Sequence, residues 1–280
     1  MRPGIISNPP HSSPEEWAEK LKTLGVRTVV LPCNENTPDA LLDRYLNLCK
    51  EMDWSIAEVG AWSNPLSGDP AEAAKNREFC KRRLAFADHV KARCCVNIAG
   101  THGGPQWDGA YKENYGKEAM KRVRDSVLEI LEDVKVHHTY YTLEPMPWMI
   151  PDSPEQYLEL INEINHERFA VHMDIVNMIS SPEKYFFNSK FMDHCFSLLK
   201  GKIRACHVKD MKIGSNLTLH LSEVPCFEGN MDLLHYAELA TEEDPDMPFI
   251  IEHLSSWESY AESFRKLNAE TKDFSVEQNT

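Results

Sequence analysis

Four side chains able to bind a metal stand at or near the ends of four consecutive apolar runs. Glu144 ends TYYTLE and Asp174 ends FAVHMD. His207 lies in IRACHV, and Glu252 ends PFIIE. Three carboxylates and one neutral imidazole suit a hard divalent cation, Mn²⁺ first, with Mg²⁺ or Co²⁺ able to replace it. The four residues predict one metal ion per chain if the runs are strands whose ends meet.

Further polar residues lie close to these positions. His172 shares the strand parity of Asp174, so it could orient a ligand, contact substrate or be a hydrogen-bonded core residue. His102 lies in the glycine-rich segment GTHGGP and could transfer a proton or structure its loop. Lys209 could stabilise developing negative charge or form an ion pair with Asp210. We therefore treat His172 and His102 as catalytic candidates and Lys209 as a substrate-binding candidate.

Three tryptophans follow the ends of predicted strands: Trp62, Trp107 and Trp148. Aromatic faces suit the C–H faces of sugar rings, although each ring could instead pack at the rim of the fold. These residues predict a sugar or polyol as the small-molecule partner.

The elements that position these residues alternate along the chain. Short β-branched runs predict eight strands, over Gly4–Ser7, Arg27–Leu31, Ser55–Val59, Arg93–Ile98, Thr139–Glu144, Phe169–Asp174, Ile203–Val208 and Pro248–Glu252. Amphipathic stretches predict eight helices, over Pro14–Leu24, Pro38–Met52, Ala71–His89, Gly116–Val134, Ser153–Asn165, Pro182–Leu199, Met231–Ala240 and Trp257–Leu267. Several begin with Ser-Pro, an N-cap followed by proline in the first helical position.

Eight successive βα units predict an α/β fold, a single (β/α)8 TIM barrel that forms one domain over residues 1–280. An open, doubly wound sheet is the alternative. It usually has a glycine-rich loop after its first strand, where this chain has ISNPPHSS. In a barrel the carboxyl ends of the strands lie at one rim, so the four candidate ligands would face one another.

Composition excludes several functions. The formal net charge is -14, which argues against nucleic acid as a partner. The chain has eight cysteines and no C-x-x-C pair, which favours buried free thiols in a reducing cytoplasm. There is neither a signal-like apolar segment at the start nor an apolar stretch of membrane-spanning length, so we expect no membrane partner.

Three motifs carry a resemblance to a known family: L-E-P at Leu143–Pro145, H-V-K-D at His207–Asp210 and E-G-N-M-D at Glu228–Asp232. With the ligand order Glu, Asp, His, Glu, the chain resembles the xylose-isomerase-like TIM-barrel superfamily, the sugar phosphate isomerase/epimerase family. Its relatives include ketose epimerases, inosose dehydratases and the catalytic subunits of C-glycoside deglycosidases. The resemblance implies that Glu144, Asp174, His207 and Glu252 bind the metal and that the two glutamates also transfer protons.

One position departs from the ketose 3-epimerases, which usually have histidine three residues after the strand-six aspartate. Here that residue is Asn177, which can hydrogen-bond a substrate hydroxyl but cannot shuttle a proton. The resemblance implies a metal-dependent isomerase or epimerase that forms an enediolate from a neutral sugar or polyol. The alternative is a lyase that expels a β-leaving group from an oxidised, 3-oxo sugar. A homo-oligomer or a small accessory subunit is compatible with either.

Overall fold

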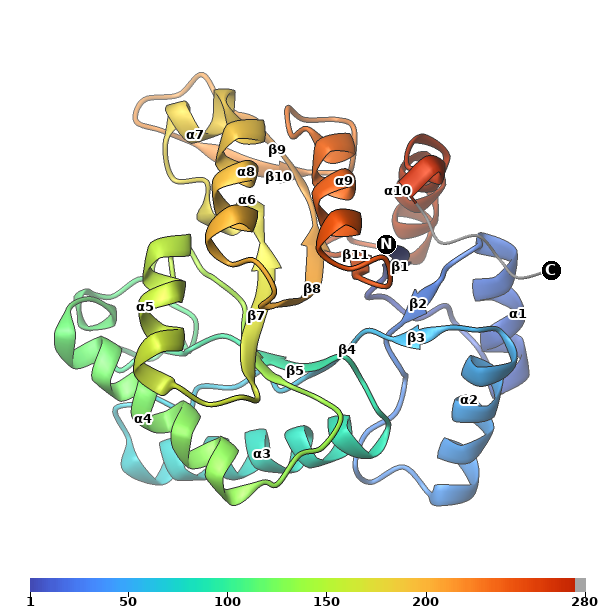
Figure 1. Ribbon diagram of the computed structural model, residues 1–280, viewed down its shortest axis with the longest axis horizontal. Coiled ribbons are helices and arrows are strands. Elements are labelled where there is room, and N and C mark those ends of the chain that lie inside the picture. The colour runs from blue at the N-terminus through green and yellow to red at the C-terminus, as the bar shows by residue number, and fades with distance from the viewer. Residues whose placement is uncertain (275–280) are drawn as a thin grey trace. The chain divides into compact units, whose positions relative to one another are not determined.

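The computed structural model describes residues Met1–Phe274, in which strands and helices alternate (Figure 1). The described residues form two compact units. Unit 1 comprises Met1–Ala57, Ile179–Ser197 and the described residues from Ala205 onward. Unit 2 comprises Glu58–Met178 and Leu198–Arg204. The single domain over residues 1–280 stays a prediction, and residues 275–280 lie outside the described part.

Parallel strands form the sheet of unit 1, in the order β3-β2-β1-β11-β8. Their bounds are Arg2–Ile5 for β1, Thr28–Val29 for β2, Ser55–Ile56 for β3, Ile203–Val208 for β8 and Pro248–Ile251 for β11. Glycine is needed in β1, because a Cβ on Gly4 would lie 2.5 Å from the carbonyl oxygen of Thr28. After β8 the chain forms an antiparallel pair of strands, β9 (Asp210–Ile213) and β10 (Leu221–Val224).

Serine N-caps begin three helices of unit 1, because Ser13, Ser181 and Ser256 each accept a hydrogen bond from a backbone N–H in the first turn. The core includes Trp17, which is fully buried and meets the Tyr45 and Trp54 rings edge to face. The helices are α1 (Pro14–Leu24), α2 (Asp39–Glu51), α7 (Pro182–Phe186), α8 (Asn188–Leu198), α9 (Leu233–Glu243), α10 (Trp257–Glu270) and the 3-10 helix η2 (Lys272–Phe274).

Unit 2 has parallel strands in the order β7-β6-β5-β4, and α3, α4 and α5 lie along one side of them (Figure 1). The Tyr157 hydroxyl, on α5, accepts hydrogen bonds from the backbone N–H groups of Leu143 and His172, which ties β6 to β7. The elements are β4 (Glu58–Gly60), α3 (Pro70–His89), β5 (Cys94–Asn97), η1 (Lys112–Asn114), α4 (Lys117–Asp133), β6 (Tyr141–Leu143), α5 (Pro154–Ile164), β7 (Phe169–Asp174) and α6 (Ile175–Met178).

The strand order and the helices between successive strands are those of an α/β TIM barrel, so the predicted fold class is confirmed. The backbone is continuous through β8. The first residues of β8 belong to unit 2, where the backbone N–H of Val171 donates to the carbonyl of Lys202. The last residues of β8 belong to unit 1 and pair with β11.

No helix within residues 1–274 is both long and apolar enough to cross a membrane.

Some predicted bounds were wrong. The run Ser55–Val59 forms two strands, β3 and β4, separated at Ala57. The predicted helix Pro182–Leu199 is two helices, because Phe187 leaves helical geometry with a ψ of 39°. The predicted helix at Met231 begins instead at Leu233, since the Asp232 carboxylate caps it by accepting the His235 N–H. The segment after β8, in which no element was predicted, contains the β9–β10 hairpin.

Candidate metal centre

Unit 2 contributes Glu144 and Asp174, which are 4% and 0% exposed. Glu144 directly follows β6, and its backbone N–H donates to the Asn97 carbonyl at 2.8 Å. Asp174 ends β7, and its Oδ1 accepts the backbone N–H of Asn177 at 3.1 Å. The side-chain Nδ2 of Asn177 donates to Glu144 Oε1 at 2.8 Å. Asn177 therefore links the two carboxylates of this unit.

Unit 1 contributes His207, in β8, and Glu252, directly after β11, and both are almost completely buried. His207 Nδ1 lies 3.0 Å from Glu252 Oε2. The Tyr236 hydroxyl donates to the His207 carbonyl, which fixes the strand at this point. The other oxygen of the glutamate, Oε1, lies 2.7 Å from the ammonium nitrogen of Lys209.

The charge of Glu252 follows from these neighbours. Burial raises the pKa of its carboxyl, but His207 and Lys209 oppose that effect and hold the pKa well below its ordinary value. Glu252 is therefore a carboxylate at neutral pH, which is the form that a divalent cation requires.

Each unit thus buries two of the residues predicted as ligands: Glu144 and Asp174 in unit 2, and His207 and Glu252 in unit 1. The donor set of three carboxylate oxygens and one imidazole nitrogen fits Mn²⁺ or Mg²⁺ and contains no thiolate. The four residues are candidate ligands for a divalent metal. Their individual roles as ligands stay a prediction.

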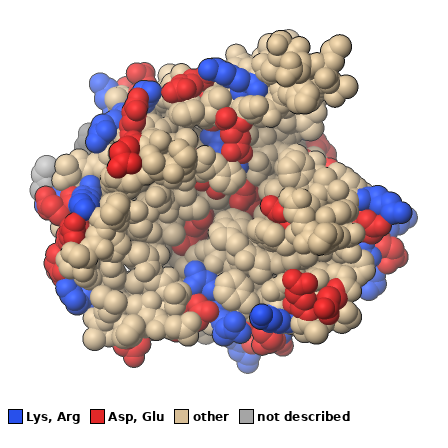
Figure 2. Space-filling model, turned by 180° about the vertical axis from the view of Figure 1, so that it is seen from behind, with Lys and Arg blue, Asp and Glu red and all other residues tan. Residues whose placement is uncertain are grey.

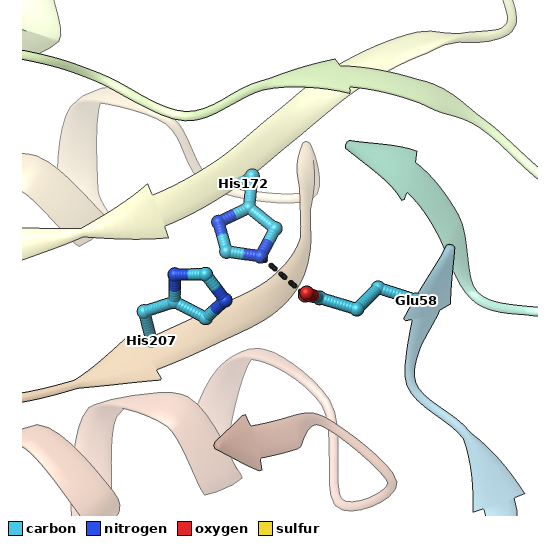
Figure 3. A group of neighbouring side chains, drawn as sticks. All are labelled: Glu58, His172 and His207. Atoms are coloured by element: carbon cyan, nitrogen blue, oxygen red, sulfur yellow. Dashed lines mark hydrogen bonds and ion pairs between the residues drawn. The ribbon is translucent and has the colours of Figure 1, made fainter. Parts of the chain in front are cut away.

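His172 is fully buried, and its Nε2 lies 2.8 Å from Glu58 Oε2 (Figure 3). Glu58 begins β4 and is 1% exposed. Glu58 was not selected from the sequence as a candidate site residue. Its position as the one acidic residue in the largely apolar run Ser55–Val59 was the signal that could have identified it. The contact gives His172 a hydrogen-bonded partner in the interior, and its catalytic role stays a prediction.

The remaining candidates of unit 2 lie on loops. His102 is exposed, and its Nδ1 lies 3.2 Å from the Leu66 carbonyl. Trp62 and Trp107 are each 38% exposed. Trp148 donates its indole N–H to the Asp108 carbonyl at 2.6 Å, which ties together the loops after β5 and β6. Their roles toward a substrate stay predictions.

Lys209 does not form the ion pair with Asp210 that was one interpretation of the sequence. The Asp210 carboxylate instead accepts the backbone N–H groups of Gly229 and Met231, which joins the H-V-K-D and E-G-N-M-D motifs. Lys209 pairs with Glu252 and lies 3.4 Å from a carboxylate oxygen of Glu223.

Glu223 and His253, which were not recognised in the sequence, complete this charged cluster. His253 directly follows Glu252, has a positive φ of 58°, and places its Nδ1 2.9 Å from Glu223 Oε2. Glu223 lies on β10, so the contact anchors the hairpin to the end of β11.

A cavity of about 230 Å³ lies beside the cluster. It is lined by Lys209, Glu223, Val224, Pro225, Glu252, His253, Leu254, Ser255 and Ser259.

The Glu223–His253 pair is expected to stabilise the metal-free protein most between about pH 4.3 and 6.5. The hydrogen bond that the His253 ring donates to Glu223 raises the pKa of His253, so the histidine's contribution is complete below its unfolded pKa and is lost as pH rises through the folded pKa. Burial raises the pKa of Glu223, but His253 and Lys209 lower it to a net value below the ordinary one. The contribution of Glu223 is therefore lost as pH falls through the lowered value.

Urea unfolding in the presence of a chelator tests this pH dependence. Glu223→Gln should lose more stability at pH 5.5 than at pH 8.5. The difference should be below about 1 kcal/mol, because His253 is half exposed and water screens the pair. Glu159→Gln, an exposed change on α5, is the control. Equal losses for Glu223→Gln at both pH values would contradict the assignment.

A family model for xylose isomerase-like TIM barrels matches residues 18–270. The chain belongs to this family, as its motifs predicted. No curated protein sequence matches the chain significantly.

Solved structures share the fold along nearly the whole chain. The apo form of 3-keto-D-glucoside 4-epimerase from E. coli is 14% identical, with a TM-score of 0.70 over 98% of this chain and 99% of that one. The probable 3-DHS dehydratase of petrobactin synthesis from Bacillus anthracis is 19% identical, with a TM-score of 0.67 over 99% and 100%. A xylose isomerase-like TIM barrel protein from Mycobacterium smegmatis, in complex with magnesium, is 13% identical, with a TM-score of 0.65 over 95% and 91%. At these identities the likeness shows the fold alone.

Proposed function

We propose that the protein is a divalent-metal-dependent sugar isomerase or epimerase that acts on a neutral sugar or polyol through an enediolate. The observation that carries the proposal is that each unit buries two of the predicted ligands at or beside its strand ends: Glu144 and Asp174 in unit 2, and His207 and Glu252 in unit 1. A divalent cation there would supply a Lewis acid that lowers the energy of negative charge on a sugar oxygen. The family supports the reaction class, and the magnesium in one structural relative supports the kind of cation.

The two glutamates receive different roles. Glu252 is paired with the buried ammonium group of Lys209, so it stays an anion and serves as a ligand. Glu144 accepts a hydrogen bond from the Asn177 amide, and we assign it as the base that removes the proton next to the sugar carbonyl. His172 has a buried carboxylate partner, and we assign it to positioning β7.

A lyase acting on 3-oxo sugars is the second candidate, because Asn177 replaces the histidine usual in ketose 3-epimerases. Removal of the same proton could expel a β-leaving group instead of being followed by reprotonation. Structural relatives named as a 3-keto-D-glucoside 4-epimerase and a probable 3-DHS dehydratase support keeping this reaction in the test.

A neutral substrate is favoured over a sugar phosphate. Lys209 already faces two carboxylates, and the segment after β11, EHLSSWESY, contains no glycine to present backbone N–H groups to a phosphate. On the face shown in Figure 2, the basic side chains of the described residues are scattered among acidic ones. We expect each active sugar to have a higher kcat/KM than its phosphorylated form. A higher kcat/KM for the phosphate, lost in Lys209→Ala, would contradict this.

NMR in D₂O tests the reaction directly. Protein loaded with Mn²⁺ is incubated with free ketoses, inososes and 3-oxo-glycosides, and quenched samples are freed of metal before measurement. Deuterium next to the carbonyl together with a new epimer or isomer supports the first candidate. Release of a β-substituent supports the lyase. Metal-loaded protein that catalyses neither change in any of these classes contradicts the proposed function.

A further inference from the structure

Every residue that lines the cavity beside Glu252 belongs to unit 1. Its volume of about 230 Å³ is below the roughly 300–1,000 Å³ of pockets that enclose a whole drug-sized ligand, so it suits part of a small molecule. Glu252 is a proposed metal ligand and also lines the cavity, so a substrate bound beside this carboxylate can extend into it. We propose that the cavity binds the neutral, hydroxylated chain of the substrate, the part that does not react. This inference rests on the proposed function.

The charged groups in the lining of the cavity neutralise one another. The Lys209 ammonium nitrogen lies 2.7 Å from Glu252 Oε1 and 3.4 Å from Glu223 Oε1. The His253 ring lies beside the same carboxylates, 2.9 Å from Glu223 Oε2 and 3.6 Å from Glu252 Oε2. Two carboxylates face one ammonium and one imidazole, so the lining has no excess of positive charge to hold an anionic group. Carboxylate oxygens can accept hydrogen bonds from the hydroxyl groups of a neutral ligand.

The rest of the lining combines apolar side chains with hydroxyl groups. Val224, Pro225 and Leu254 supply apolar contacts, and Ser255 and Ser259 supply hydroxyls. A serine hydroxyl can both donate and accept a hydrogen bond, as a sugar hydroxyl can. The C–H groups of a sugar chain can pack on the apolar side chains while its hydroxyls bond to the polar ones. The lining therefore matches a polyol chain better than a purely apolar group.

The wall of the cavity at the end of β11 is held in place by contacts within the protein. His253 has a φ of 58°, a left-handed conformation that a non-glycine residue keeps only where its surroundings enforce it. The contact with Glu223 fixes the ring, and the backbone N–H of Leu254 donates to the Tyr260 hydroxyl at 3.3 Å. A preformed wall loses little freedom when a ligand binds, which favours selection by the length of the chain.

Ligand-observed NMR with Mg²⁺-loaded protein tests the cavity without requiring turnover. The probes are glycerol, erythritol and D-sorbitol, and binding should strengthen in that order as the hydroxylated chain lengthens. Val224→Trp, which fills the cavity, should weaken D-sorbitol binding about tenfold or more, because the ring occupies the space of the chain. Ser259→Ala should weaken it about three- to tenfold, the effect of losing one hydrogen bond.

Kinetics provide a second readout once the sugar screen has identified a substrate. Val224→Trp should raise KM and change kcat little, because the cavity contacts atoms that do not react. Leu234→Trp on α9 and Ser215→Ala between β9 and β10 are the matched controls. Both positions are exposed and outside the lining, so these variants should bind D-sorbitol as the wild type does.

Circular dichroism checks that each variant is folded, and Ser259→Ala keeps the inference testable if Val224→Trp is unstable. Unchanged D-sorbitol binding in folded Val224→Trp would overturn the inference, as would wild-type protein that binds none of the three polyols. Displacement of D-sorbitol by inorganic phosphate would also overturn it, because the cavity would then be an anion site. Binding of D-sorbitol that is lost in Val224→Trp and kept in Leu234→Trp, with no sugar transformed, would overturn only the proposed function.

Discussion

His207→Ala and Asp174→Ala are expected to lose the bound divalent cation and, with it, all measurable activity. Each change removes one of the four proposed ligands, all of which are buried, and the remaining three would not hold the cation in competition with water. The fall in Mn²⁺ affinity should exceed about 100-fold, the upper range for residues that only support a ligand. Metal analysis after gel filtration, together with the sugar assay, measures both losses.

His138→Ala is the matched control, because His138 is exposed and outside the candidate centre. It should retain the wild-type metal content. A His207→Ala protein with one tightly bound cation per chain and normal turnover would contradict the ligand assignment.

Glu144→Gln is expected to separate catalysis from metal binding. The substitution keeps an oxygen for the cation and for the Asn177 amide but removes the base, so turnover should fall about 10²–10⁴-fold while most of the metal remains. Glu252→Gln should behave differently, because it removes the charge that balances buried Lys209. The free energy of unfolding should fall by about 3 kcal/mol, and the bound metal should be lost as well.

Kinetics, metal content and urea unfolding of the two glutamine variants measure this contrast. If Glu144→Gln keeps a near-normal rate with metal bound, another group is the base. If Glu252→Gln is as stable as the wild type, the Lys209 pair does not have the role assigned to it.

Strand type and order were predictable because they depend on local pattern. The runs Phe169–Asp174 and Ile203–Val208 are β7 and β8 with the predicted bounds, since apolar residues predominate in each. The candidate ligands stand at or beside strand ends, so strand periodicity and the barrel rule were enough to select Asp174, His207 and their two partners.

Contacts between distant side chains were not predictable in the same way. Glu58 and His172 are 114 residues apart, and nothing local to either residue indicates the other. The anchoring of Glu223 on His253 depends on the β9–β10 hairpin, which the polar segment after β8 did not reveal. Asn177 was recognised only as a departure from relatives. Its contact with Glu144 depends on the short helix α6, which is too brief to give a periodic signal.

Metal-dependent proton exchange is the most direct measurement of the central claim. A sugar identified in the NMR screen is followed in D₂O with one protein sample in three states: as loaded with Mn²⁺, after exhaustive chelation, and after Mn²⁺ is added back. We predict that deuterium enters the position next to the carbonyl in the first state, stops in the second and returns in the third. An exchange rate that is the same in the chelated sample as in the loaded one, with metal analysis confirming removal, would contradict the account.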